Sequence, residues 1–232
     1  MNPVEPRPWA PPHRDCPLCP RLVAFRAANR LANPEWHNAP VPSFGPLEAP
    51  LLIVGLAPGL RGANRTGRPF TGDYAGELLY GSLLRFEFAN GVYGAHPDDN
   101  LVLKNCRVSN AVRCVPPANL PKSSEIRACN HFLAGEIDAM PALRAILALG
   151  AVAHAAILRA RRVRLRAFPF RHGAIHDLPD GLVIGDSYHV SRYNTNTGRL
   201  NEAMFHSVLT GLQQRIVPGP IRQSKKVANQ AS

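Results

Sequence analysis

Four short strand-like runs alternate with helix-like stretches along the middle of this chain. The runs that we expect as strands are Leu51–Gly55, Arg107–Val112, Ala145–Leu149 and Leu182–Gly185. The stretches that we expect as helices are Gly76–Phe88, Ser123–Asp138, Ala151–Arg161 and Gly198–Arg215. Strands that alternate with helices pair in parallel beneath helical layers. The pattern therefore predicts an α/β fold, a three-layer sandwich with a central, mostly parallel four-stranded sheet flanked by helices.

The loops that follow the predicted strands have an unusual amino-acid composition. Segments 55–73, 110–122 and 186–199 are rich in Gly, Pro, Asn, Arg and His. Ligands of parallel sheets bind beyond the carboxyl ends of the strands. We therefore expect the chemistry of the chain to lie in these three segments.

One domain is expected over residues 13–216, which is enough chain for a substantial core. Residues 1–12 are expected to form a flexible Pro-rich arm, and residues 217–232 a basic, mobile tail. No apolar run approaches the roughly 20 residues of a membrane span, and the N-terminus lacks the features of a signal peptide. The expectation is a soluble, monomeric, cytoplasmic protein without a membrane partner.

The chain is strongly basic, with a formal net charge of +11. Such a surface attracts polyanions, and nucleic acid is the first expectation. Basic tails without a partner are the alternative. The arginine-rich run 159–171 likewise admits two interpretations, contact with phosphates or a solvated face.

The cysteines are spaced as metal ligands. Cys16 and Cys19 form a C-x2-C clip, and fourteen residues separate Cys114 from Cys129. An odd total of five without a secretory signal argues against a disulfide framework. Four thiolates suit zinc and iron–sulfur clusters alike, and two surface thiols plus two core cysteines are the alternative. Cys106 fits neither pair and is expected as a buried thiol at the edge of a strand.

Three segments in the expected loops form a recognisable set of motifs. They read GLAPGLRGANRTGRPFTGD over Gly55–Asp73, NAVRCVPP over Asn110–Pro117 and HVSRYNTNTGRL over His189–Leu200. The first lacks the Gly-Lys-Ser/Thr of a Walker loop and the GxGxxG order of a dinucleotide fold. Together with the four cysteines, the motifs resemble the type-b (family 5) uracil-DNA glycosylases over roughly residues 14–215.

This resemblance implies base-excision repair by hydrolysis of the N-glycosidic bond of a flipped base. The implied substrate is DNA that contains uracil or other deaminated bases. It also implies a [4Fe-4S] cluster on Cys16, Cys19, Cys114 and Cys129. A non-catalytic iron–sulfur protein that binds or senses DNA is the alternative, and a zinc-stapled nucleotide-binding enzyme is a third possibility.

Two residues of the motifs bear on how close the resemblance is. Leu56, at the second position of the first motif, is the type-b pattern. Val190 replaces the usual Pro after the motif His, a departure expected to loosen that loop.

Each candidate site residue has a functional and a structural interpretation. Phe70 can stack on a flipped base or plug the core. Asn110 can bind a base edge or tie down a loop. Asp73 can orient water and stabilise a cationic sugar, or cap a helix, and the two roles are compatible. His189 can donate to the oxygen of the leaving base, although a lone His is usually structural.

The remaining candidates surround these four. By resemblance, the backbone amides near Leu56 and Ala57 hold the base. The loop tip Arg192, Tyr193 and Asn194 probes the minor groove by resemblance, with a solvated turn as the alternative. Phosphate contacts are expected from Arg61, Arg65, Arg68 and Lys122.

Overall fold

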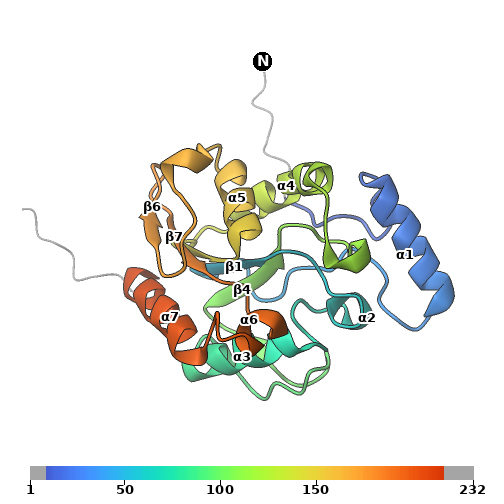
Figure 1. Ribbon diagram of the computed structural model, residues 1–232, viewed down its shortest axis with the longest axis horizontal. Helices are drawn as coiled ribbons and strands as arrows, with labels where there is room; N and C mark the ends of the chain where they lie inside the picture. Colours follow the sequence, from blue (N-terminus) through green and yellow to red (C-terminus); the bar gives the residue numbers. More distant parts are fainter. Residues whose placement is uncertain (1–8, 217–232) are drawn as a thin grey trace, which may run out of the picture.

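The computed structural model describes residues 9–216 (Figure 1). The first eight residues of the predicted arm and the predicted tail 217–232 lie outside the described residues.

The described chain begins with a helix and then alternates strands with helices. The helices are α1 (Pro20–Ala32), α2 (Ala63–Thr66), α3 (Tyr74–Arg85), α4 (Ser123–Asp138), α5 (Ala151–Ala160), α6 (Arg192–Asn196) and α7 (Glu202–Ile216), with 3-10 turns η1 (Pro117–Asn119) and η2 (Leu165–Ala167). The strands are β1 (Leu51–Gly55), β2 (Ala89–Asn90), β3 (Val102–Leu103), β4 (Cys106–Asn110), β5 (Ala145–Leu149), β6 (Ile175–Asp177) and β7 (Val183–Ser187).

The main sheet has the strand order β4-β1-β5-β7-β6, and β2 and β3 form a separate small hairpin. β4, β1, β5 and β7 are parallel to one another, whereas β6 runs antiparallel to β7. The predicted α/β fold with a mostly parallel central sheet is therefore confirmed. The sheet has five strands rather than the predicted four, because the short edge strand β6 carries no apolar run that would indicate it.

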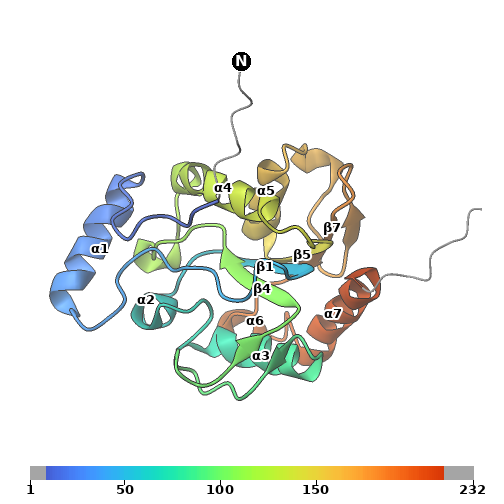
Figure 2. The same cartoon turned by 180° about the vertical axis from the view of Figure 1, so that it is seen from behind.

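Helices cover both faces of the sheet (Figures 1 and 2). Side chains of a strand alternate between the two faces, and Leu51 and Ile53 of β1 belong to one core with residues of α3 and α7. Leu52 and Val54 belong to the opposite core with residues of α4 and α5. Every residue of β1 is buried, which explains its continuous apolar sequence.

Helix α1 lies beyond the β4 edge of the sheet and was not expected from the sequence (Figure 1). Only Leu22, Arg26 and Asn29 of α1 are buried, so its sequence carries no strong apolar face. The described end of the predicted arm contacts α4, where the Trp9 indole donates to the carbonyl of Phe132 at 3.2 Å.

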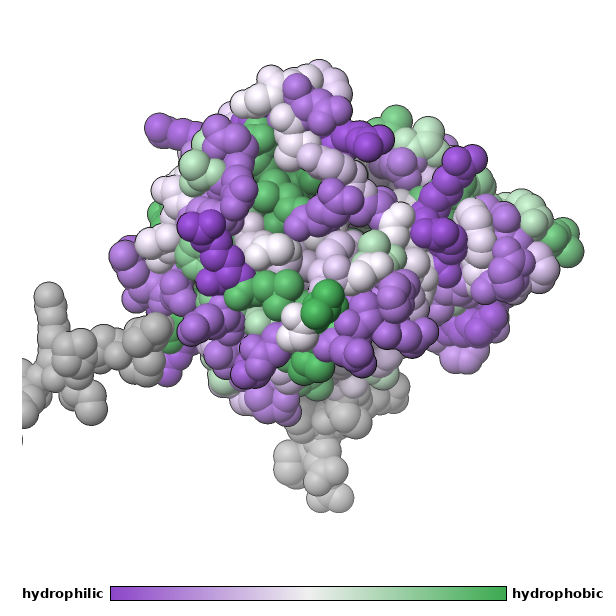
Figure 3. All heavy atoms as spheres, turned by 90° about the horizontal axis from the view of Figure 1, so that it is seen from below, coloured by the Kyte–Doolittle hydropathy of each residue, from purple (hydrophilic) through white to green (hydrophobic). Residues whose placement is uncertain are grey.

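No helix in the described part of the chain is both long and apolar enough to cross a bilayer. On the face seen from below in Figure 1, hydrophilic side chains predominate and hydrophobic patches are small (Figure 3).

Candidate active site

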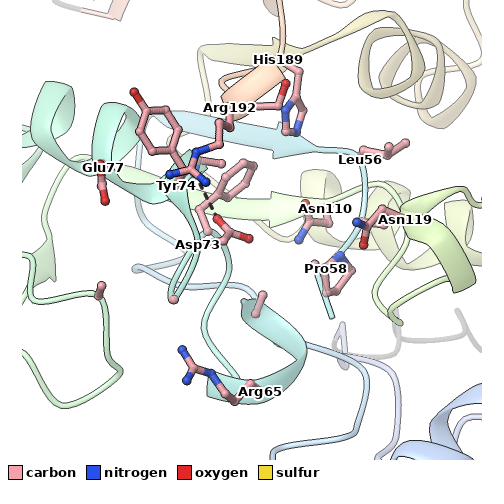
Figure 4. Close-up of a pocket in the computed structure, with 18 residues that line it drawn as sticks. Leu56, Pro58, Arg65, Asp73, Tyr74, Glu77, Asn110, Asn119, His189 and Arg192 are labelled. Atoms are coloured by element: carbon pink, nitrogen blue, oxygen red, sulfur yellow. Dashed lines mark hydrogen bonds between the residues drawn. The ribbon is translucent and has the colours of Figure 1, made fainter. Parts of the chain in front are cut away.

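A pocket of about 830 Å³ opens where β1, β4 and β7 end, at the edge of the sheet that the sequence pointed to. Figure 4 shows side chains from all three loops directed into this space. Eight of the ten predicted non-cysteine site residues line it, namely Leu56, Ala57, Arg65, Phe70, Asp73, Asn110, His189 and Arg192. Tyr193 and Asn194 are outside its lining.

Gly55, the last residue of β1, lies against two side chains that line the pocket. A Cβ atom there would collide with the ring of Phe70 and lie 2.5 Å from Oδ1 of Asn110. The absence of a side chain therefore lets an aromatic face and an amide meet at one point. Phe70 is 7% exposed and has a left-handed φ of 51°, a conformation that is rare outside glycine. The Tyr93 hydroxyl donates to the Phe70 carbonyl at 3.1 Å and helps to hold this turn.

Asn110 lines the pocket and carries a buried, unsatisfied polar atom. It is the last residue of β4 and pairs in register with Gly55. Its side-chain Oδ1 is buried and has no hydrogen-bond partner within the described residues. A buried polar atom without a partner costs about 1–3 kcal/mol, so an amide that turns its Oδ1 toward a donor in the pocket recovers this free energy.

Asp73 caps helix α3 and also lines the pocket. It is the N-cap of α3, where its Oδ1 accepts from the backbone N–H of Ala75 at 3.2 Å. Its other oxygen, Oδ2, lies close to Gly59 and Gly62. A Cβ atom at Gly59 would be 2.9 Å from Oδ2, and a Cβ atom at Gly62 would collide with it. The carboxylate therefore rests on a glycine-lined loop and remains accessible through the pocket mouth. Desolvation in the pocket raises the pKa of Asp73, and the hydrogen bonds from the helix amides oppose this rise.

His189 faces Phe70 across the pocket, with ring centroids 6.0 Å apart. Burial lowers the pKa of His189 to about 4, so the imidazole is neutral at physiological pH and carries one N–H donor. Its loop is anchored rather than loosened at the position where Val190 replaces Pro, because Val190 is fully buried in the core.

The motif His189–Leu200 forms one rim of the pocket, and its tip folds as the short helix α6, where we expected a loop. The guanidinium of Arg192 stacks on the ring of Tyr74 at 5.2 Å, and Tyr193 is 71% exposed. The amide of Asn194 instead donates to the His189 carbonyl at 2.8 Å. Asn194 thus holds the histidine loop from within.

Arg65 lies on the opposite side of the pocket from His189 (Figure 4). Arg68 is not available for phosphate contacts, contrary to the expectation. It is 5% exposed, and its two terminal nitrogens bind Asp99 at 2.7 and 2.6 Å. This pair holds the pKa of Asp99 well below its usual range. Arg68 is therefore part of the scaffold behind the pocket.

Sequence reasoning missed Asn119, which lines the pocket beside Asn110 and Pro58 (Figure 4). Asn119 and its neighbour Ala118 have left-handed φ values of 56° and 55°. Two such residues in succession indicate a turn that the surrounding structure imposes. The pair of prolines before this turn is the one local signal in the sequence.

The four predicted cluster cysteines line one further cavity, between α1, α4 and the segment after β4. The cavity walls are otherwise apolar apart from Arg26 and Arg113. In the described part of the chain, no three cysteine sulfurs lie within 4.8 Å of one another. A single zinc ion lies about 2.3 Å from each thiolate, so the sulfurs that bind it would lie within 4.8 Å of one another. Cys106 lies apart from the cavity, fully buried in β4.

The cysteine cavity and the pocket are connected by Arg21, two residues after Cys19. Its guanidinium binds Glu125 of α4 through two hydrogen bonds of 2.8 and 2.7 Å. It also donates to the carbonyl of Leu120 at 3.0 Å. Leu120 follows Asn119, so the helix that begins at the cysteine clip also fixes the turn that lines the pocket.

A second cluster of possible metal ligands lies under the β6–β7 edge and consists of His154, His176 and Asp186. Both ring nitrogens of His154 already have acceptors, the Asp186 carboxylate at 2.7 Å and the Phe168 carbonyl at 2.8 Å. Burial is the largest single influence and lowers the pKa of His154, but the hydrogen bond and the charge of Asp186, together with the Phe168 carbonyl, raise the pKa overall. We therefore interpret this cluster as a hydrogen-bonded network.

Comparison with known proteins gives one family. A model of the uracil DNA glycosylase superfamily matches residues 42–213. A type-5 uracil-DNA glycosylase of Thermus thermophilus is 46% identical over 200 residues, which cover 84% of this chain and 90% of that protein. Proteins of the same name from Pyrobaculum aerophilum and Mycobacterium leprae are 36% and 38% identical, over 84% and 83% of this chain and 86% and 88% of their own lengths.

Proposed function

Because the chain belongs to the uracil DNA glycosylase superfamily, we propose that the pocket at the ends of β1, β4 and β7 is its catalytic site. The protein is a base-excision-repair enzyme that hydrolyses the N-glycosidic bond of uracil in DNA. We assign it to the type-5 (type-b) branch, which the names of its relatives and the motif residue Leu56 support.

The observation that carries the catalytic assignment is the convergence of four side chains on one pocket. Phe70 offers an aromatic face, Asn110 an unpaired amide oxygen, His189 a neutral donor and Asp73 a carboxylate. Cleavage of a base from deoxyribose calls for each of these properties. A pocket of about 830 Å³ is also ample for a single extruded base.

In this arrangement the base stacks on Phe70, and the Asn110 amide turns so that its Oδ1 accepts from an N–H of the base. This bond satisfies the buried oxygen and favours a base that carries a ring N–H beside its carbonyl groups. The backbone near Leu56 and Ala57 forms the adjoining wall.

As the bond breaks, negative charge develops on the base and positive charge on the sugar. The neutral imidazole of His189 donates to a base oxygen without adding a positive charge beside the sugar. The Asp73 carboxylate orients the attacking water and stabilises the cationic sugar. Asn119 lies close enough to the pocket to contact the same water or the base.

DNA reaches the pocket across a basic surface. The net charge of +11 supports non-specific attraction of the phosphates, and Arg65 and Arg192 stand at the pocket for local contacts. The exposed ring of Tyr193 fits the role of a probe that fills the space left by the extruded base. We further propose a monomer that acts in the cytoplasm.

Cys16, Cys19, Cys114 and Cys129 would hold the [4Fe-4S] cluster of this enzyme. Their common cavity and their wide spacing support a group larger than one metal ion. When bound, the cluster supplies cross-links between α1, the segment after β4 and α4. No step of base removal is assigned to it.

The test is incubation with oligonucleotides that each contain one uracil, hypoxanthine, xanthine or ethenocytosine, scored for abasic sites. The same sequence with thymine is the matched control. We expect cleavage at uracil and at further deaminated bases, and none at thymine. Absence of abasic sites from uracil at saturating enzyme would refute the catalytic assignment. Iron content, measured on the same preparation, tests the cluster separately.

A further inference from the structure

Arg26 of α1 is a buried cation in an unusual environment. Only 4% of its surface is exposed, and it lines the cavity of the four cysteines. Cys19 is the N-cap of α1 and Arg26 lies close to two turns further along the helix, and both line the cavity.

The hydrogen-bond partners of Arg26 are a sulfur and a carbonyl. One terminal nitrogen donates to Sγ of Cys114 at 3.5 Å, and the other donates to the carbonyl of Cys16 at 3.0 Å. Both partners belong to residues of the cysteine set. Arg26 therefore contacts the clip and the third cysteine at the same time.

The other buried guanidinium groups of the described chain have carboxylate partners. Arg68 binds Asp99, and Arg107 and Arg113 share Glu136. Arg26 makes no ion pair with a carboxylate among the described residues. Burial of an uncompensated charge is strongly unfavourable, so the cavity has to supply a negative charge from another source.

Metal-bound cysteines supply that charge, because a coordinating thiol is deprotonated. We propose that Arg26 is the counter-charge of the metal-loaded cysteine site and that its bond to Cys114 favours retention of the metal group and its electron-rich state. This proposal rests on the proposed cluster. It assigns Arg26 as a positioning residue that acts through the ligand Cys114, with no contact to the base or the sugar.

Two substitutions separate charge from packing. Arg26→Met keeps most of the side-chain volume and removes the charge, in a cavity whose walls are mostly apolar. Arg26→Lys keeps the charge and loses the planar fork. Arg127→Met is the matched control, because Arg127 is exposed on α4 two residues before Cys129 and the same charge is removed into solvent.

The experiment uses the full-length protein as purified, with three measurements. These are iron per chain, the rate of iron loss to a strong chelator, and the reduction potential from a titration in which dithionite supplies the electron. Loss of a residue that supports a metal ligand typically costs about 10–100-fold in affinity. We expect Arg26→Met to release iron about 10–100-fold faster and to have a lower reduction potential. Arg26→Lys should lie close to the wild type, and Arg127→Met should equal it.

Equal release rates and potentials in Arg26→Met and the wild type would overturn the proposal. Arg26→Lys behaving like Arg26→Met would overturn the charge argument, because the charge is retained there. If the wild type carries zinc, the iron–sulfur assignment fails, and zinc release by the same variants tests Arg26. If the wild type carries no metal, the metal centre and the role of Arg26 fail together, whereas uracil excision still tests the catalytic assignment.

Discussion

Asp73 has two functions that a pair of substitutions can separate. As the N-cap of α3 it accepts one backbone N–H, and as a carboxylate in the pocket it orients water. Asn caps a helix about as well as Asp, whereas Ala cannot accept this bond and costs about 0.5–2 kcal/mol of stability. Asp73→Asn therefore removes the charge and keeps the cap, and Asp73→Ala removes both.

The expected rates follow from the catalytic role. General-base assistance is typically worth about 10²–10⁴ in rate, which corresponds to about 2.7–5.4 kcal/mol of activation free energy. Asp73→Asn and Asp73→Ala should both lose this factor. Only Asp73→Ala should also lose about 0.5–2 kcal/mol in the free energy of unfolding.

Single-turnover excision of uracil at saturating enzyme measures the chemical step apart from binding, and urea unfolding measures stability. Cleavage by Asp73→Asn at the wild-type rate would refute the catalytic role and leave Asp73 as a helix cap. The water would then be positioned by Asn110 or Asn119, the nearest alternatives in the pocket. An equal loss of stability in both variants would show that the cap argument is wrong.

Three further predictions use other parts of the structure. Phe70→Ala should weaken capture of the base by about 1–3 kcal/mol, or about 5–150-fold in KM, with Phe70→Leu as a control that fills the core without a ring. The single-turnover rate should fall as the pH is lowered through the acid range, because Asp73, whose pKa is raised, must be ionised, and because His189, with a pKa of about 4, is neutral only above that pH. A transition near pH 6.5 would contradict the burial of His189. Glu136→Gln should destabilise the protein by about 3–5 kcal/mol in urea unfolding, because it leaves Arg107 and Arg113 buried without their carboxylate. The exposed Glu35→Gln should change stability little.

The central sheet could be predicted because its strands are buried on both faces. A run such as Leu51–Gly55 has no polar residue to confuse its assignment. β6 escaped prediction because an edge strand of three residues needs few apolar side chains. Helix α1 escaped because it is mostly exposed and its buried positions include Arg26 and Asn29. Polar side chains at buried positions give no apolar period to detect.

The site could be predicted as far as it depends on motifs that follow strands. Asn110 ends β4, and Asp73 and His189 lie in the segments that follow β1 and β7, so the fold brings the three together. Arg68 was misjudged because Asp99, its partner, is thirty-one residues away in sequence. Asn119 was missed because its position depends on left-handed backbone angles that residue types do not reveal. Long-range pairing and backbone strain are properties of the folded chain.

The contacts of Arg21 have a thermodynamic consequence. Arg21 of α1 donates to the Leu120 carbonyl and to Glu125. Binding of a metal group beside α1 and the position of Asn119 in the pocket wall therefore depend on the same contacts. Linkage between two binding sites is reciprocal. Whatever factor the metal group contributes to the affinity for an extruded base, a base analogue in the pocket must contribute equally to retention of the metal group. If the four cysteines hold a metal group, its loss would change the pocket wall at Asn119, and an occupied pocket would in turn help to retain it.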